Sequence, residues 1–566
     1  MDGFLQSGPS LGNPFAEDPL LQAYLRWRLP PDLQETLAPG LLEFGRVVLE
    51  EVQDLGREAE AHPPRLVQFS PWGGRIDRIE VSGAWKRLRG IAARAGLVSI
   101  GYERREGDFS RLHQFARLYL FHPGSAWSTC PLAMTDGAAK AIEEHGDEAL
   151  RDRILPHLLT RDPEEFWTSG QWMSERAGGS DVGRTGTVAR KQGGTWRLYG
   201  SKWFASSADS PVALALARIE GSPAGSAGLS LFCVELFDEA GSLRDIRVRR
   251  LEDKLGSRAL PTAELDLEGA PAALVGDKAH GVRKIASLFN LTRVHNSVYA
   301  AASLRRALAL AKDYAARREA FGRPLLQLPA HAEGLAALQV EWEGCFHLAF
   351  HLALLQGRLE GGGADGGGAA LMRLLTPAAK LHTAKAAGAG AIEAMEAMGG
   401  AGYLEDTGFP ALVRDALALP IWEGTANVLA LDVLRALDRD GAFEPYCEDV
   451  AARLRKAKAD PLAEGVRRVR RALEALQETR ERLAGEGEEF AQAAARPFAL
   501  GIARTFIGSL LLEFAAWMGE AAPAADPGRP RSSAVALRWC RGPLFEPVEA
   551  DEAHRRMSLG ILREHP

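Results

Sequence analysis

Glu423 is the residue in this sequence whose surroundings best suit acid–base chemistry. It lies in the segment Leu419-Pro-Ile-Trp-Glu-Gly-Thr-Ala-Asn-Val428, just before an expected helix that Thr425 is suited to cap. Bulky apolar neighbours desolvate a carboxylate, which raises its pKa and makes it a better base toward a weak carbon acid. The segment therefore predicts a general base, and an exposed loop glutamate is the open alternative.

Two earlier segments carry groups that suit a flat heterocycle. The stretch 173–182 places hydroxyls, small residues and backbone amides in a turn, which suits the polar edge of a ring or a phosphate. The stretch Ser201-Lys-Trp-Phe-Ala-Ser-Ser207 puts aromatic rings beside hydroxyls, an arrangement for stacking on a ring and donating to its edge. An ordinary loop and ordinary strand packing are the alternatives for the two segments.

Other common motifs are missing from the sequence or poorly placed. The chain has no Gly-Lys dipeptide, and so no Walker A loop, and it has no HExxH zinc helix. Gly8-Pro-Ser-Leu-Gly12 matches a nucleophile elbow in letters only, because no strand precedes it. His347 and His351 are one helical turn apart in an apolar run without a carboxylate, which favours core histidines over metal ligands. We therefore predict no metal site.

The spacing of apolar residues predicts four regions that position these segments. Three- and four-residue spacing predicts a helical domain over 1–165, and short alternating runs predict a small antiparallel β domain over 166–276 with a hairpin at Gly193-Gly194. The helical period returns over 277–440, where a Gly-rich insert at 361–368 predicts a flexible connection, and it continues in an extension over 441–566. The expected helices include 82–95, 138–159, 282–316, 331–359, 372–398 and 427–437.

Composition narrows the class of protein. With 566 residues, 46% hydrophobic and 25% charged, the chain has the mix of a folded globular protein. Five cysteines without a CxxC pair favour a reducing compartment, and neither a secretory signal nor a membrane span is predicted, so we expect a cytoplasmic location.

The net charge of −6 excludes a surface that is basic throughout, so any contact with nucleic acid must be local. The extension after residue 440 is charge-balanced, but its basic residues cluster at Arg467, Arg468, Arg470 and Arg471. These arginines suit the phosphates of a duplex. The alternative is a solvated helix face on which they pair with Glu474 or Glu478.

Between about residues 60 and 440, the chain resembles the acyl-CoA dehydrogenase family, because six separated motifs occur in the family's order. The motifs are Ser174-Glu175 with Gly179-Ser180-Asp181; Gly200, Lys202, Phe204 and Ser206; Arg318, Phe321 and Gly322; Gly399, Gly400, Gly402 and Tyr403; Arg414-Asp415-Ala416; and Ile421 to Thr425. The resemblance implies an α+β protein of acyl-CoA dehydrogenase fold. Such a fold has an N-terminal helical domain, a middle antiparallel β domain and a C-terminal four-helix bundle, to which this chain adds an extra helical domain.

The resemblance also implies an FAD site that two subunits share, so that oligomerisation is part of the site, and the AidB-like branch considered below implies a homotetramer. Met173 and Ser174 would lie at the pyrimidine edge, Phe204 on the ring and Ser206 at N5. Arg318 and the Gly399-Gly400 turn would reach the FAD of a neighbouring subunit. The remaining members of the implied FAD shell are Ser180, Thr425 and Asn427.

For the reaction, the resemblance implies that Glu423 removes the α-proton of an acyl-CoA while the β-hydrogen leaves as hydride to flavin N5. The Glu423 N–H and a ribityl hydroxyl would polarise the thioester oxygen, and Arg293 matches an arginine near the base. An electron-transfer flavoprotein is the family's usual electron acceptor. An oxidase acting on acyl-CoA or a nitroalkane is a weaker alternative.

Within the family, the AidB-like branch, associated with the bacterial response to DNA alkylation, is the nearer likeness. The features that carry it are Pro63-Pro-Arg-Leu66, Ser128-Thr-Cys-Pro131, Trp203-Phe204, Leu251 to Arg258, Thr376-Pro-Ala-Ala-Lys380, Trp422 and the helical extension after Asp440. In this branch the C-terminal domain is associated with double-stranded DNA. The likeness therefore implies an alternative function, a DNA-binding protective protein with weak or no dehydrogenase activity.

Overall fold

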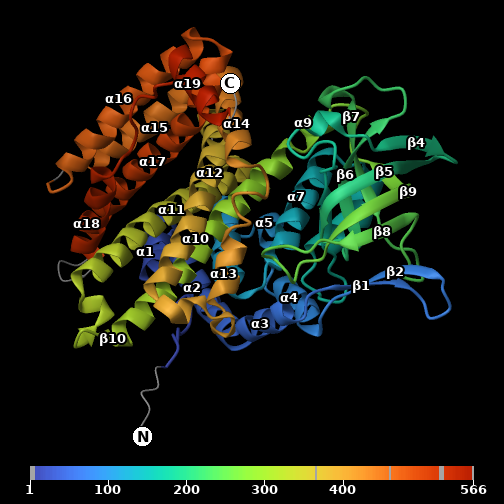
Figure 1. The fold of residues 1–566 in the computed structure, drawn as a ribbon, viewed down its shortest axis with the longest axis horizontal. Helices are drawn as coiled ribbons and strands as arrows, with labels where there is room; N and C mark the ends of the chain where they lie inside the picture. The colour runs from blue at the N-terminus through green and yellow to red at the C-terminus, as the bar shows by residue number, and fades with distance from the viewer. Residues whose placement is uncertain (1–6, 364–365, 458–459, 522–527, 564–566) are drawn as a thin grey trace, which may run out of the picture.

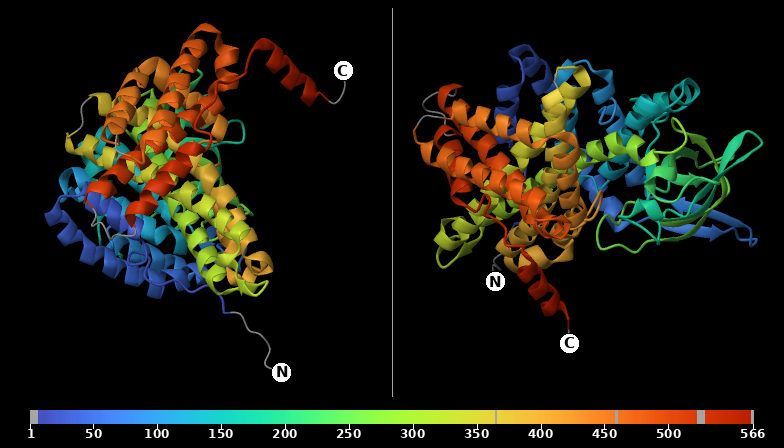
Figure 2. Two further views of the ribbon diagram at one scale, coloured as in Figure 1. Left: turned by 90° about the vertical axis from the view of Figure 1, so that its left-hand side faces the viewer. Right: turned by 90° about the horizontal axis from the view of Figure 1, so that it is seen from above.

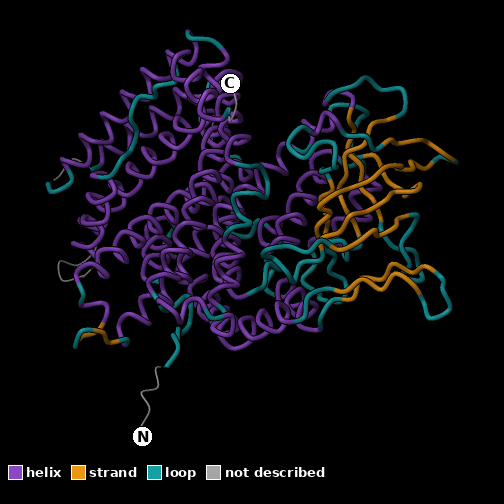
Figure 3. Tube along the Cα trace, in the orientation of Figure 1, coloured by secondary structure: helices purple, strands orange, loops and turns teal. Residues whose placement is uncertain are grey.

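The computed structural model describes residues 7–363, 366–457, 460–521 and 528–563. A large helical body occupies one side of the molecule, and a β domain lies at the other side (Figure 1). Figure 3 shows the same division, with the strands gathered at one end apart from a short pairing at the far edge. Helices from all parts of the chain surround one continuous apolar core.

The N-terminal region is helical, as predicted, and also contains a β-hairpin that the sequence analysis missed. Its helices are α1 Pro19–Arg28, α2 Pro31–Val47, α3 Gln53–Ala61, α4 Gly83–Arg94, α5 Ile100–Glu103, α6 Ser110–Phe121, α7 Thr129–His145 and α8 Glu148–Leu159. The hairpin joins β1 Arg65–Phe69 to β2 Arg75–Glu80. It extends toward the β domain, where Arg75 donates to the backbone oxygen of Val248 at 2.9 Å. Most side chains of the hairpin are exposed or half-buried, which explains why it lacks a strong apolar pattern of its own.

The middle domain is a seven-stranded sheet. Its strands are β3 Ser169–Trp172, β4 Val188–Gln192, β5 Thr195–Ser206, β6 Val212–Ile219, β7 Leu229–Glu235, β8 Ile246–Leu251 and β9 Thr262–Leu274. The order is β3-β6-β4-β5-β9-β7; β7 also pairs with β6, and β8 pairs with β9. Gly193 and Gly194 both have positive φ, +56° and +86°, as the predicted hairpin between β4 and β5 requires.

The prediction of an antiparallel domain holds for most pairings but not for two short ones. β3 and β4 each pair with β6 in parallel. The difference arises because β3 arrives from the helical region and runs along the edge of β6, a long-range pairing that alternation within a strand does not encode. β3 carries one residue of the candidate site described below, Gln171.

The third region is a four-helix bundle. Its long helices are α10 Ala286–Arg317, α11 Pro329–Gly361, α12 Gly366–Ala397 and α14 Ala426–Asp440. The short helices α9 Gly281–Lys284 and α13 Phe409–Ala416 precede α10 and α14, and β10 Glu319–Ala320 pairs with β11 Arg323–Pro324 after α10. The predicted break near 361–368 is confirmed between α11 and α12, although residues 364–365 of that insert lie outside the described residues.

The C-terminal extension is helical, as expected. It contains α15 Phe443–Lys456, α16 Ala463–Gly485, α17 Glu488–Ala521, α18 Gly528–Arg541 and α19 Glu552–Leu562. α15, α16 and α18 surround α17, and α19 projects away from the body (Figure 2). Within the described residues, the segment Glu488–Glu520 is long and apolar enough to cross a membrane, but its apolar window is 89% buried inside the protein, which is typical of a core helix.

A buried carboxylate on α17 ties the extension to the N-terminal helices. Glu513 is 4% exposed and forms ion pairs with Arg453 on α15, with Lys456 at 2.7 Å and with Arg28 on α1 at 3.4 Å. Burial alone would raise the pKa of Glu513, but Arg453, Arg28 and Lys456 outweigh it and lower the pKa to about 2. Glu513 therefore stays ionised in the folded protein at pH values at which it is already protonated in the unfolded chain.

We expect Glu513→Gln to destabilise the protein in a pH-dependent way. Because the folded pKa is depressed, the carboxylate contributes stability above about pH 4.5, and that contribution falls as the pH drops toward 2. The gap in free energy of unfolding between wild type and variant should be on the order of 3 kcal/mol above pH 5 and should narrow with acid. Chemical denaturation across this range measures it, with exposed Glu520→Gln as control. A gap that stays constant with pH would contradict the assignment.

Candidate functional site

The candidate base, Glu423, lies in the loop between α13 and α14, where three domains meet. Its backbone adopts a left-handed conformation with φ of +58°, which turns the loop sharply between Trp422 and Gly424. The half-buried side chain accepts a hydrogen bond from Gln171 Nε2 on β3 at 3.0 Å. Trp422 packs edge-on against Trp127, just before α7, with ring centroids 6.1 Å apart. The loop is thus fixed against both the β domain and the N-terminal helices.

Two cations from the bundle clamp the backbone of this loop. Lys380 on α12 donates to the Gly424 oxygen at 2.6 Å, and Arg293 on α10 donates to the Glu423 oxygen at 3.4 Å. Arg293 is itself paired with Asp432 on α14 at 2.6 Å. Arg293 therefore lies beside the candidate base, as the family resemblance implied. It donates to the backbone of Glu423, and among the described residues no ion pair joins it to the Glu423 carboxylate.

Burial raises the pKa of Glu423, as predicted from its apolar neighbours. Arg293, the Thr292 hydroxyl, Lys380 and Gln171 oppose this shift only in part. Burial also lowers the pKa of Lys380 to about 7, against the attraction of Glu423. A carboxylate with a raised pKa is suited to accept a proton from a weak acid near neutral pH.

Gln171, Thr292 and Lys380 are site residues that the sequence analysis missed. Gln171 was detectable in principle, because it precedes Met173 by two residues and alternate residues of a strand share a face. Lys380 was noted only as part of a motif. Its contact with Gly424 depends on how α12 packs against the loop, which the sequence does not encode locally.

The predicted ring-binding residues gather on the β domain, next to Gln171. Met173 and Ser174 follow β3, and the Trp203 N–H donates to the Ser174 oxygen at 3.0 Å. The neighbouring Phe204 is 48% exposed and has φ of +53°, where β5 bulges against β9. Ser206 is half-buried at the end of β5. An exposed ring, a hydroxyl and a backbone turn therefore share one surface.

A buried ion pair holds this surface together. Lys202 on β5 is fully buried and donates to Glu175 Oε1 at 2.7 Å and to the Leu216 oxygen at 2.9 Å. Glu175 also accepts from Gly186 N at 2.7 Å and from the Thr187 hydroxyl at 2.6 Å. The charged residues of the turn motif and the strand motif thus pair with each other, which fixes Ser174 relative to Phe204. Ser180, farther along the turn, is exposed.

The other predicted cofactor residues lie on elements outside the β domain. Arg318 directly precedes β10, which lies at the opposite edge of the molecule from β5 (Figure 1). Gly399 and Gly400, after α12, are exposed. Thr425 stands at the start of α14 and Asn427 in its first turn, both exposed; Thr425 is the N-cap residue, but its side chain does not make the capping bond that we expected.

The paired histidines of α11 are core residues. His347 is 0% exposed and His351 is 7% exposed, and burial lowers the pKa of His347 to about 3. The Arg28 and Arg453 side chains lie near them and oppose any further positive charge. The structure therefore supports neutral histidines packed among aromatic rings.

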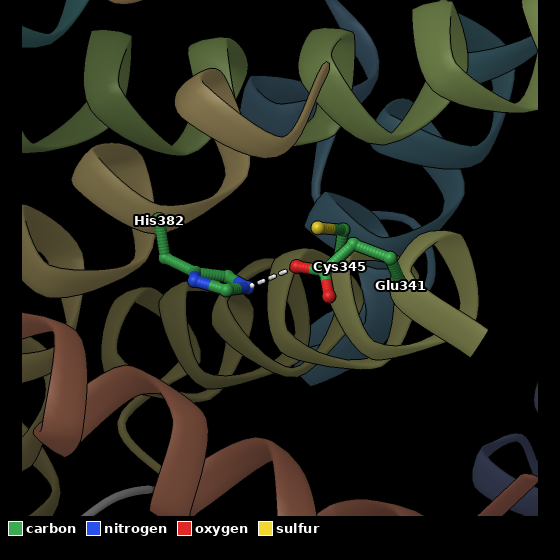
Figure 4. A group of neighbouring side chains, drawn as sticks. All are labelled: Glu341, Cys345 and His382. Atoms are coloured by element: carbon green, nitrogen blue, oxygen red, sulfur yellow. Dashed lines mark ion pairs between the residues drawn. The ribbon is translucent and has the colours of Figure 1, made fainter. Parts of the chain in front are cut away.

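A separate cluster joins α11 to α12, with half-buried Glu341 and buried Cys345 and His382 pointing toward one another (Figure 4). His382 Nε2 lies 3.0 Å from Glu341 Oε1, and Arg504 of α17 lies 3.6 Å from Glu341 Oε2. Burial raises the pKa of the Cys345 thiol well above its usual value. Since Arg504 already faces the Glu341 carboxylate and burial favours the protonated Cys345 thiol, the cluster is better suited to an ion pair between α11 and α17 than to a metal ion.

The basic cluster of the extension lies on α16. Arg467, Arg468, Arg470 and Arg471 are all exposed. Arg468 pairs with Glu464 at 3.2 Å. In the described part of the chain, none of the four pairs with Glu474 or Glu478, which was the expected alternative. Three of the four arginines therefore present their charge to solvent.

Four family models match consecutive parts of the chain. They are the adaptive response protein AidB N-terminal domain at 9–164, the acyl-CoA dehydrogenase middle domain at 170–270, the acyl-CoA dehydrogenase C-terminal domain at 279–437 and the acyl-CoA dehydrogenase 11 C-terminal domain-like model at 441–560. The match to the AidB model covers nearly all of the N-terminal helical region. The last model covers the helical extension.

Two curated relatives and one solved structure share most of the chain. Acyl-CoA dehydrogenase family member 11 of Caenorhabditis elegans is 42% identical over 91% of this chain and 86% of its own length. Putative acyl-CoA dehydrogenase AidB of Escherichia coli is 34% identical over 70% of this chain and 74% of its own. A crystal structure of Caenorhabditis elegans ACDH-11 in complex with C11-CoA superposes with a TM-score of 0.95 and 39% identity, covering 100% of this chain and 97% of the other.

Proposed function

Because the chain belongs to the acyl-CoA dehydrogenase family and is AidB-like within it, we propose that it is an FAD-dependent dehydrogenase of acyl-CoA thioesters. Glu423 is the general base, and the product carries a double bond between Cα and Cβ. One observation carries the proposal: a carboxylate of raised pKa, Glu423, accepts a hydrogen bond from Gln171 on β3, the strand that leads into Met173 and Ser174 of the predicted ring-binding surface. A base facing a ring-binding surface is the arrangement that the reaction needs.

The residues present fit FAD. Phe204 offers an exposed ring face, and the backbone of Ser174 and the hydroxyl of Ser206 flank it. Trp203 Nε1 and Gln171 Oε1 are buried and have no hydrogen-bond partner among the described residues, a condition that a bound polar molecule relieves. Met173, Ser174, Ser180, Phe204 and Ser206 would hold the ring and its edge. Bound FAD supplies the acceptor for the β-hydride.

A second copy of the chain completes the site in this proposal. Arg318, Gly399 and Gly400 would contact the FAD of a neighbouring subunit, while Thr425 and Asn427 complete the shell. Large apolar side chains stand exposed next to both groups: Phe321 is 94% exposed and Tyr403 is 78% exposed. Exposed apolar surface of this kind commonly marks a protein interface, which supports assembly as a homotetramer.

In the reaction, Glu423 accepts the α-proton while the surrounding protein excludes water. The N–H of Glu423 has no hydrogen-bond partner among the described residues, so it is available to the thioester oxygen, where negative charge develops. Arg293 and Lys380 hold the next two carbonyl oxygens of the chain, those of Glu423 and Gly424, and so fix the backbone that carries this N–H. The chain therefore provides both the base and a donor for the developing charge.

The relative crystallised with C11-CoA makes medium-length acyl-CoAs the first substrates to test. We expect the purified protein to be yellow, and anaerobic titration with a panel of acyl-CoAs to bleach the flavin absorption near 450 nm. Admitting oxygen afterwards distinguishes a dehydrogenase, which re-oxidises slowly and needs a partner such as an electron-transfer flavoprotein, from an oxidase. Bound FAD that no acyl-CoA bleaches would overturn the proposed reaction, and a colourless protein that cannot be loaded with FAD would overturn the cofactor.

A second function, protection of DNA, is favoured by the exposed arginines of α16 and by the AidB relative. In this proposal the C-terminal domain holds double-stranded DNA through Arg467, Arg468, Arg470 and Arg471, and turnover is weak.

The five cysteines are all free thiols, which supports a reducing, cytoplasmic location for either function.

Charge reversal of these four arginines to glutamate tests the DNA proposal. We expect weaker duplex retention and a slope of log affinity against log salt that is smaller by roughly three to four, about 0.9 for each phosphate that an arginine no longer neutralises. A gel-shift series at several salt concentrations measures both. Reversal of Arg26 and Arg57, exposed residues of the N-terminal helices, is the control. If the parent protein retains no duplex, or the variant retains it equally, the arginines have no such role.

A further inference from the structure

Lys254, in the loop between β8 and β9, is a half-buried cation without an acidic partner. Its ammonium donates to the Leu260 oxygen at 2.7 Å and to the Thr262 hydroxyl at 2.8 Å. Within the described ranges it forms no ion pair. Burial lowers the pKa of Lys254 to about 8. Asp415, Glu60 and Glu252 attract the ammonium without forming an ion pair, and they offset the cost of burial only in part. The two neutral acceptors are the groups that bond to the ammonium directly and fix its position.

The hydrogen bonds continue from Thr262 to Ser206. Ser206 and Thr262 face each other in the register of β5 and β9, and their hydroxyl oxygens are 3.2 Å apart. Strand pairing therefore fixes the distance between the two hydroxyls. The result is an unbroken path from Lys254, through Thr262, to the hydroxyl that stands on the ring-binding surface.

Counting protons gives this path a direction. An ammonium group only donates, so the Thr262 oxygen accepts from Lys254. The Leu260 oxygen already accepts the shorter bond from Lys254 and lies 3.4 Å from the Thr262 hydroxyl, so the closer acceptor for the Thr262 proton is Ser206. Ser206 then accepts from Thr262, and its own proton is free to point away from the sheet.

We propose that Lys254 and Thr262 are positioning residues that fix the Ser206 hydroxyl as a hydrogen-bond donor toward the flavin ring. This inference rests on the proposed function, since it requires FAD on the surface formed by Phe204 and Ser206. Without the path, neither Thr262 nor Lys254 sets the direction in which the Ser206 hydroxyl points. With the path, the Ser206 hydroxyl is oriented before the cofactor binds. Its rotational freedom is lost when the protein folds, and no further entropy is lost when FAD binds.

A mutant cycle on FAD affinity tests the path. Released-flavin fluorescence gives the dissociation constant for FAD of wild type, Lys254→Met, Thr262→Val and Ser206→Ala, and of the first two changes combined with Ser206→Ala. We expect each single change to weaken FAD binding by about tenfold, the size of one hydrogen bond of this kind. In the Ser206→Ala background, Lys254→Met and Thr262→Val should have almost no further effect, because the group they orient is gone.

Conservative rescue and a control separate this role from a general structural one. Thr262→Ser, which keeps the hydroxyl, should retain the wild-type affinity and the wild-type visible absorption band of the bound flavin, whereas Thr262→Val should shift that band. Lys191→Met, at an exposed lysine of the same domain, should change neither. Effects of Lys254→Met and Thr262→Val that persist undiminished in the Ser206→Ala background would overturn the path. Failure of the wild-type protein to bind FAD would instead overturn the proposed function.

Discussion

Glu423→Gln is expected to bind FAD like the wild type and to lose reduction of the flavin by acyl-CoA by a factor of about 10³ or more. The substitution keeps the shape and the hydrogen bond from Gln171 but removes the only group at this position that accepts a proton. Removal of a general base commonly costs about 10²–10⁴ in rate, and the larger values apply where the site excludes water. Anaerobic stopped-flow absorbance at 450 nm measures the loss.

The raised pKa of Glu423 adds a pH signature to this prediction. Burial raises the pKa of Glu423, so this carboxylate ionises at a higher pH than an ordinary glutamate does. Because only the ionised form accepts a proton, the wild-type rate should rise as the pH passes through the raised pKa. The residual rate of Glu423→Gln should lack this rise. Glu393→Gln, at an exposed position on α12, is the matched control. A variant at position 423 that reduces the flavin at the wild-type rate would remove this carboxylate from the mechanism.

Lys202→Met is expected to lower the free energy of unfolding by about 3–5 kcal/mol, the usual cost of leaving one member of a buried ion pair unpaired. Lys202 is fully buried, and its loss leaves Glu175 without a cation and the Leu216 oxygen without its donor. Because the pair fixes the turn at Ser174 against β5, FAD retention should fall together with stability. Urea denaturation and the ratio of flavin to protein after gel filtration measure the two effects.

Two further variants test whether the loss of stability in Lys202→Met comes from the broken ion pair. Lys191→Met, on the neighbouring strand β4 but exposed, should leave stability and flavin content within error. The double variant Glu175→Gln, Lys202→Met should recover part of the stability, because it removes the uncompensated charge. Equal stability of Lys202→Met and the wild type would show that the pair is not what holds this surface.

Local sequence patterns predicted most of the elements near the site. The β domain, its hairpin at Gly193-Gly194 and the helices of the bundle follow from alternation, from positive-φ glycines and from three- and four-residue spacing, which depend only on near neighbours. The raised pKa of Glu423 was also predictable, because its apolar neighbours Ile421 and Trp422 adjoin it in the chain. Local signals of this kind are carried by a few consecutive residues.

Only the tertiary structure decided which distant residues meet. The contacts of Glu423 with Gln171, of Gly424 with Lys380 and of Thr262 with Ser206 join residues of different strands and helices. The parallel placement of β3 beside β6 brings Gln171 to the base, and no property of residues 169–172 alone specifies that neighbour. Long-range pairing depends on the packing of whole elements around the shared core. The sequence by itself therefore determined the candidate base and the ring-binding strand, and the packing decided which cations, amides and hydroxyls orient them.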